Sequence, residues 1–169
     1  MDETTLQLSQ PLRACWMKRG QQRVFPTKLG LVQSTALIGA YDWLSDTVVV
    51  QRIAKLNRDS VIDFLMYLLT EIYPHDNIVL IMDHASSHTS LDTLALLALF
   101  EHRVRVVWSP KYSPELNLIE RFWQHLKKTV CAHRLYLKIE ELFQDVSDFI
   151  RLQNTPTYPE RILFSKNFL

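Results

Sequence analysis

The chain has 169 residues, 47% of them hydrophobic, and its formal net charge at pH 7 is +1. That length predicts one domain, and the hydrophobic content is ample for a sizeable core. Three glycines leave no Gly-rich phosphate loop, the two cysteines Cys15 and Cys131 are too few for a zinc site, and no apolar run approaches the roughly 18 residues of a membrane span.

The first third of the chain predicts β-strands. Apolar and β-branched runs, separated by Gly or charged turns, predict strands at residues 4–9, 13–17, 34–41 and 47–53. Because the connections between the later runs are short, we expect antiparallel pairing.

Helical and strand patterns alternate in the rest of the chain. Apolar residues recur with a helical period in residues 58–73, 90–102 and 139–153, and again after Asn117. Residues 78–82 and 104–108 are short apolar runs typical of buried strands. This order predicts an α/β sandwich in which helices flank a mixed sheet.

An acidic residue stands at the end of the strand predicted at residues 78–82. Asp83 follows Met82 and precedes small polar residues, so we expect its carboxylate to point out of the end of the sheet. Taken alone, an Asp at such a place is more often an ordinary turn residue than a catalytic one.

A second acidic residue lies in the first turn of the helix that begins after Asn117. Glu120 falls on the polar edge of that helix with Gln124 and Lys127, where it can face a charged ligand. The alternative is a capping box, in which the Glu120 side chain bonds back to the main-chain N–H of Asn117.

The stretch YSPELNLIERFWQHLK (residues 112–127), together with IMDHASSHTS (residues 81–90), resembles the signature of the DDE transposases of insertion-sequence and mariner-like elements. The resemblance implies that Asp83 and Glu120 are the second and third catalytic acids. The 36 residues between them resemble the interval typical of the family. The first acid of the family belongs to an Asp-Glu pair, which MDETTLQL supplies, and we assign it to Asp2.

Two residues depart from the family pattern. Leu118 stands where a Pro is usual, although Asn117 can still cap the helix. His84 stands where an Asn is usual, and it either alters the metal environment or makes the hydrogen bonds of that Asn.

The family resemblance extends over nearly the whole chain. It implies a ribonuclease H-like fold, in which we expect residues 1–169 to form a single DDE catalytic domain. The family carries a helix-turn-helix DNA-binding region upstream of this domain, and we expect it to be absent from this chain. Because Asp2 stands so near the start, we expect the first strand to be truncated.

The family also implies a metal site of three acids. Two Mg²⁺ or Mn²⁺ ions about 3.5–4 Å apart can activate a nucleophile and stabilise the leaving oxygen in phosphodiester cleavage, and carboxylates suit such ions. Asp83 would bind both ions, and Asp2 and Glu120 would each bind one of them. His88 and Asn117 would lie behind these ligands and orient them without binding the ions.

Basic residues form two groups that can contact DNA phosphates. The first lies between residues 13 and 28, where no acid occurs, and the second lies on or near the Glu120 helix. The members we assign are Arg13, Lys18, Arg19, Arg23, Lys28, Arg121, Lys127 and Lys128. A solvated hairpin or loop explains the first group about as well.

The implied function is metal-dependent DNA cleavage and strand transfer during transposition of an insertion sequence. Element ends and target DNA would be the substrates, the active complex a homodimer, and the location cytoplasmic and nucleoid-associated, without a membrane. Two alternatives remain: a catalytically inactive remnant that binds DNA or a partner transposase, and a stand-alone ribonuclease H-like nuclease or resolvase.

Overall fold

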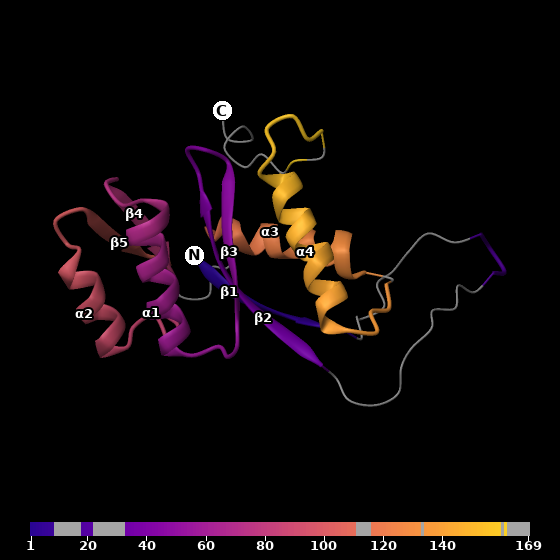
Figure 1. Cartoon of the computed structure of the whole chain (residues 1–169), viewed down its shortest axis with the longest axis horizontal. Coiled ribbons are helices and arrows are strands. Elements are labelled where there is room, and N and C mark those ends of the chain that lie inside the picture. The colour runs from indigo at the N-terminus through magenta and orange to yellow at the C-terminus, as the bar shows by residue number, and fades with distance from the viewer. Residues whose placement is uncertain (9–17, 22–32, 111–115, 133, 160, 162–169) are drawn as a thin grey trace.

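The computed structural model describes residues 1–8, 18–21, 33–110, 116–132, 134–159 and 161 (Figure 1). The first sheet has three antiparallel strands in the order β1-β2-β3, which are β1 (Asp2–Gln7), β2 (Ser34–Asp42) and β3 (Thr47–Ile53). The predicted antiparallel pairing is therefore confirmed. The strand predicted at residues 13–17 lies outside the described residues.

A tight turn joins β2 to β3. The Asp42 carboxylate accepts hydrogen bonds from the main-chain N–H groups of Leu44 (2.8 Å) and Ser45 (3.4 Å), and Asp46 has a left-handed backbone conformation with φ of 53°. Asp adopts this conformation more readily than most residues other than glycine, so the local sequence favours the turn.

The second sheet has two parallel strands, β4 (Ile78–Met82) and β5 (Val104–Trp108), joined through helix α2 (Leu91–Leu99). Helix α1 (Arg58–Tyr67) precedes β4 and continues as a π-helical segment. Asn57 and Ser90 cap α1 and α2, because each side chain accepts a hydrogen bond from a main-chain N–H in the first turn.

Helices α3 (Leu118–Leu126) and α4 (Ile139–Gln153) lie on the opposite side of the three-stranded sheet from α1 and α2 (Figure 1). A π-helical segment, Lys127–Cys131, extends α3. In both helices one face is apolar and buried, as their helical periodicity predicts.

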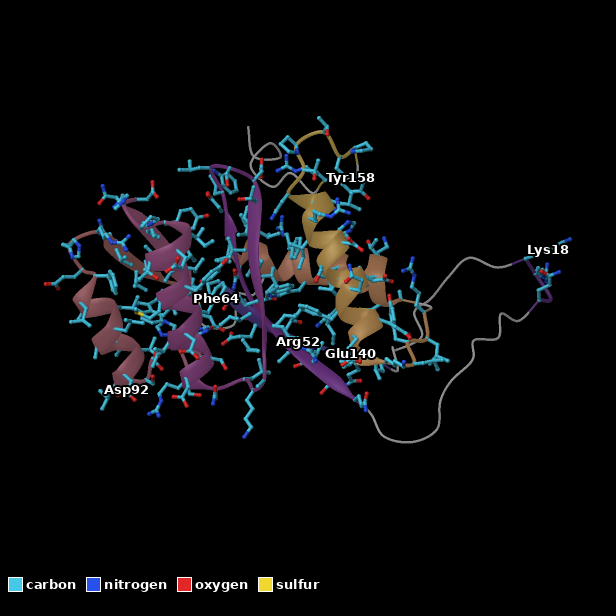
Figure 2. The ribbon with its side chains drawn as sticks, in the orientation of Figure 1. Lys18, Arg52, Phe64, Asp92, Glu140 and Tyr158 are labelled. Carbon is cyan, nitrogen blue, oxygen red and sulfur yellow. The ribbon has the colours of Figure 1, made fainter. Side chains whose placement is uncertain are left out.

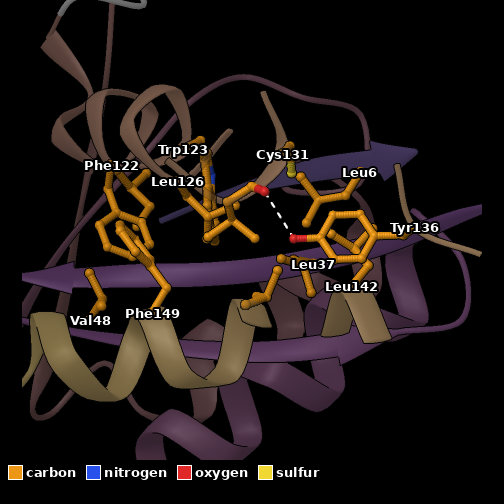
Figure 3. Close-up of a cluster of buried hydrophobic side chains, with 13 residues drawn as sticks. Leu6, Leu37, Val48, Phe122, Trp123, Leu126, Cys131, Tyr136, Leu142 and Phe149 are labelled. Carbon is orange, nitrogen blue, oxygen red and sulfur yellow. Dashed lines mark hydrogen bonds between the residues drawn. The ribbon is translucent and has the colours of Figure 1, made fainter. Parts of the chain in front are cut away.

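Two hydrophobic clusters lie on the two faces of the central strand β2. Leu37 is buried against α3 and α4 in one cluster, which we call the α3–α4 cluster (Figure 3). Ile38 is buried with α1, α2, β4 and β5 in the other, the α1–α2 cluster. Neighbouring residues of a strand point to opposite faces, so β2 contributes to both clusters at once.

The α/β sandwich predicted from the sequence is confirmed, although the pairings of the described strands form two separate sheets. The sheets meet where the main-chain nitrogen of Met1 donates a hydrogen bond of 3.0 Å to the carbonyl oxygen of Ile81 on β4. Strand β1 pairs with β2 along all six of its residues. The start of β1 therefore lies beside the end of β4.

Candidate active site

Asp83 follows directly on β4, with its side chain 49% exposed. One of its carboxylate oxygens, Oδ1, accepts a hydrogen bond of 3.1 Å from the N–H of Ala85 and lies 2.6 Å from Nδ1 of His88. The turn that follows β4 therefore fixes the orientation of this carboxylate, while half of the group stays open to solvent.

The imidazole of His88 is completely buried between two carboxylates. Its other ring nitrogen, Nε2, lies 3.2 Å from the carboxylate of Glu3, whose side chain is 14% exposed. Burial lowers the pKa of His88, but hydrogen bonding to Glu3 and the charges of Glu3 and Asp83 outweigh it, so the pKa is raised above its ordinary value. His88 thus links β1 to the turn after β4.

Asp2 and Glu3 point to opposite faces of β1, because side chains alternate along a strand. Asp2 shares its face with Leu6, which belongs to the α3–α4 cluster. The pKa of Asp2 is raised to about 6, chiefly by burial, and the charges of Glu3, Glu120 and Asp83 act in the same direction. The Asp2 carboxylate therefore lies within the electrostatic reach of both other acids assigned from the sequence.

Glu120 lies in the first turn of α3. The preceding loop is tied to β1, because the buried Asn117 side chain donates a hydrogen bond of 3.3 Å to the carbonyl oxygen of Met1. Asn117 occupies the N-cap position, yet its side chain makes no capping hydrogen bond, so that expectation is wrong. Its amide holds the start of α3 against the start of β1 instead.

His84 lies on the surface, with its imidazole stacked on the indole of Trp108. The ring centroids are 5.3 Å apart and the ring planes differ by 22°. This contact gives His84 a packing role beside Asp83.

Among the residues that the structure describes, no three His, Cys, Asp or Glu side chains form a ready-made metal-binding group. Asp2, Asp83 and Glu120 lie on three separate elements: β1, the turn after β4 and the first turn of α3. A cavity of about 600 Å³ lies elsewhere, toward the Gln7 end of β1, and Thr5, Arg52 and Lys55 are among its lining residues.

The basic residues assigned to DNA are only partly described. Arg13, Arg23 and Lys28 lie outside the described residues. Lys18 and Arg19 are exposed in a turn, and Figure 2 shows Lys18 far from the packed helices and sheets. On the extended α3, Arg121 and Lys128 are exposed and Lys127 is half-buried, so this second group is a continuous part of the helix that holds Glu120.

Sequence reasoning overlooked the contact between Glu3 and His88. The Asp-Glu pair at the start of β1 was the available signal, since strand alternation sends the two carboxylates to opposite faces. No helix in the described part of the chain is both long and apolar enough to cross a membrane.

Comparison with known proteins identifies a family, a relative in sequence and solved structures of similar fold. The family model of the DDE superfamily endonucleases matches residues 1–143. An uncharacterized 39 kDa protein of insertion element IS630 from Shigella sonnei is 30% identical over 151 residues, which are 88% of this chain and 43% of that protein.

Solved structures of Mos1 transposase have a similar fold. A paired-end complex with the left transposon end has a TM-score of 0.66 and 17% identity, over 89% of this chain and 46% of that chain. A strand transfer complex has a TM-score of 0.67 and 16% identity, over 88% of this chain and 45% of that chain. This likeness confirms the predicted ribonuclease H-like fold. The chain spans less than half the length of these relatives.

Proposed function

Since the chain belongs to the DDE superfamily endonucleases, we propose that residues 1–169 form the catalytic domain of an insertion-sequence transposase. It cuts DNA and joins the freed 3′ hydroxyl to a target strand. The observation that carries the proposal is that hydrogen bonds of Met1 join the start of β1 to Ile81 on β4 and to Asn117 before α3, the elements that carry Asp83 and Glu120. Like charges are costly to gather unless a cation joins them.

The donor set fits Mg²⁺ or Mn²⁺. Carboxylate oxygens are the ligands that such hard ions prefer, and Asp2, Asp83 and Glu120 would hold two of them, with Asp83 shared. His88 holds one oxygen of Asp83 at 2.6 Å, so the other oxygen stays available. When bound, the ions neutralise the phosphate and activate the attacking water or hydroxyl.

The protein residues supply orientation and charge around the scissile phosphate. Cleavage forms a bond from a water oxygen to phosphorus and releases the 3′ hydroxyl, which then attacks a phosphorus atom of the target and displaces another 3′ oxygen. Arg121, Lys127 and Lys128 lie along the helix that holds Glu120, where they would bind flanking phosphates. Element ends and target are the DNA partners, a homodimer would pair the two ends, and the protein would work at the nucleoid.

The first test is a calorimetric Mn²⁺ titration of the wild type, Asp83→Ala and Glu120→Ala. We expect binding by the wild type and its loss in both variants, together with loss of metal-dependent cleavage and joining of element-end DNA. Asp148→Ala is the matched control, because Asp148 is a carboxylate on α4 that pairs with Arg151. It should bind and cleave like the wild type.

Three outcomes would redirect the assignment. Cleavage near the wild-type rate by a folded Asp83→Ala variant would contradict the role of Asp83. DNA binding without Mn²⁺ binding would favour the inactive remnant. Cleavage without joining would favour a stand-alone nuclease or resolvase.

A further inference from the structure

Gly39 occupies the middle of β2, where it pairs with Asp2 on β1 and with Val50 on β3. Its φ lies outside the left-handed region, so its backbone conformation does not require glycine. On backbone grounds alone, Ala should be tolerated here or even stabilising, because Ala restricts the unfolded chain more than Gly does.

The space above Gly39 gives a different reason for glycine. A Cβ atom at this position would lie 2.8 Å from Cη2 and 2.9 Å from Cζ2 of Trp123, and 3.1 Å from the carbonyl oxygen of Val49. Carbon atoms in favourable contact are about 3.5–4 Å apart. The indole of Trp123 therefore rests directly on the backbone of β2.

Two residues assigned to the acid site, Glu120 and Asp2, lie on the elements that meet at this contact. Trp123 follows Glu120 by three residues, so the two side chains lie one turn apart on neighbouring faces of α3. Asp2 is the direct cross-strand partner of Gly39 and shares the face of the sheet that meets α3. The contact thus stands between the strand that holds Asp2 and the helix that holds Glu120.

We propose that Gly39 and Trp123 are positioning residues, whose contact sets the separation of the Asp2 and Glu120 carboxylates. Trp123 is 3% exposed, and Phe122 and Leu126 pack beside it in the α3–α4 cluster, so the indole has little room to turn aside (Figure 3). A methyl group at Gly39 would move α3 away from the sheet. This inference rests on the proposed function, because it assumes that the acids bind metal.

The test combines a steric clash with its relief. Gly39→Ala adds the methyl group, whereas Trp123→Phe removes the two indole atoms that it would strike. We expect Mn²⁺ to bind about tenfold more weakly to Gly39→Ala, as is common when residues behind metal ligands are changed. The double variant should bind as tightly as Trp123→Phe alone. Urea unfolding of all four proteins separates lost affinity from lost folding.

Two results would overturn the proposal. One is Mn²⁺ affinity in a folded Gly39→Ala variant equal to that of the wild type. The other is a double variant that binds Mn²⁺ no more tightly than Gly39→Ala does. The weaker binding would then not come from the clash with Trp123. If Gly39→Ala does not fold, equal affinity of the double variant and Trp123→Phe supports the proposal, and unequal affinity overturns it.

The proposed function can fail separately, if the folded wild type binds no Mn²⁺. Amide hydrogen exchange of the metal-free proteins then decides the inference. Exchange in the first turns of α3 should be faster in Gly39→Ala and return to the Trp123→Phe rate in the double variant. Unchanged exchange in Gly39→Ala would overturn the positioning role.

Discussion

Replacing His88 by Leu tests the link that joins β1 to the turn after β4. The variant places an apolar side chain in a completely buried position and removes both ring nitrogens. Glu3, 14% exposed, then loses the partner that lies 3.2 Å away, and Asp83 loses the partner at 2.6 Å. We therefore expect a folded but less stable protein.

The two lost hydrogen bonds contribute unequally to the free energy of unfolding. A buried hydrogen bond to a charged group contributes about 1.5–3 kcal/mol, and that range applies to Glu3. Asp83 is half exposed, so solvent screening reduces its share to about 1 kcal/mol or less. The free energy of unfolding at pH 6 should fall by about 2–4 kcal/mol in total.

The loss should depend on pH with a definite sign. The pKa of His88 is raised in the folded state, so the stability from the charged imidazole is fully present below the unfolded value of about 6.5. It disappears as the pH rises through the folded pKa. Once the ring is neutral it can donate only one hydrogen bond, so the cost of His88→Leu should fall toward about 1–2 kcal/mol as the pH rises.

Urea unfolding of the wild type and His88→Leu at pH 6 and pH 9 measures the effect. His75→Leu is the matched control, because His75 is exposed in the loop before β4 and should change stability little at either pH. An equal loss at both pH values, or a larger loss at pH 9, would refute the charged link.

Three further predictions concern other residues. Burial, chiefly, raises the pKa of Asp2 from 3.8 to about 6, so folding becomes less favourable as the pH rises through that interval. Asp2→Asn should raise the free energy of unfolding by about 1–2 kcal/mol at pH 8 and leave it unchanged at pH 3.5, measured by thermal unfolding. Changing Lys127 and Lys128 to Gln should weaken DNA binding and flatten the slope of log affinity against log salt by about 1.8, and an unchanged slope would exclude these phosphate contacts. Arg103→Ala removes hydrogen bonds to three main-chain carbonyls of residues 69–76 and should cost about 2–4 kcal/mol in urea unfolding, whereas Arg105→Ala, an exposed control, should cost almost nothing.

Local patterns predicted the regular elements well. The bounds of β3 and α4 match the sequence predictions, because their apolar residues follow one period from end to end. Helix α2 ends at Leu99, three residues before the predicted end. The difference has a tertiary cause, since Arg103 turns back to bind the end of the α1 segment and stacks on Phe100 at 5.1 Å.

Contacts between distant residues were beyond a reading of periodicity. The candidate acids were assigned from short motifs, each of which lies at the end of one element, and their roles stay predictions. Asn117 bonding to Met1, Glu3 meeting His88 and Gly39 supporting Trp123 each join residues more than 80 positions apart. Such contacts depend on how the helices pack on the sheets, and short patterns in a single sequence do not predict that packing.

The division of the core into two clusters has a consequence for partly folded molecules. Asp2 and Glu120 belong to elements that pack in the α3–α4 cluster, whereas Asp83 follows a strand of the α1–α2 cluster. A folding intermediate in which one layer has formed without the other therefore brings together at most two of the three acids. On the proposed function, a newly made chain stays harmless to the host chromosome until both layers have closed on the central strand.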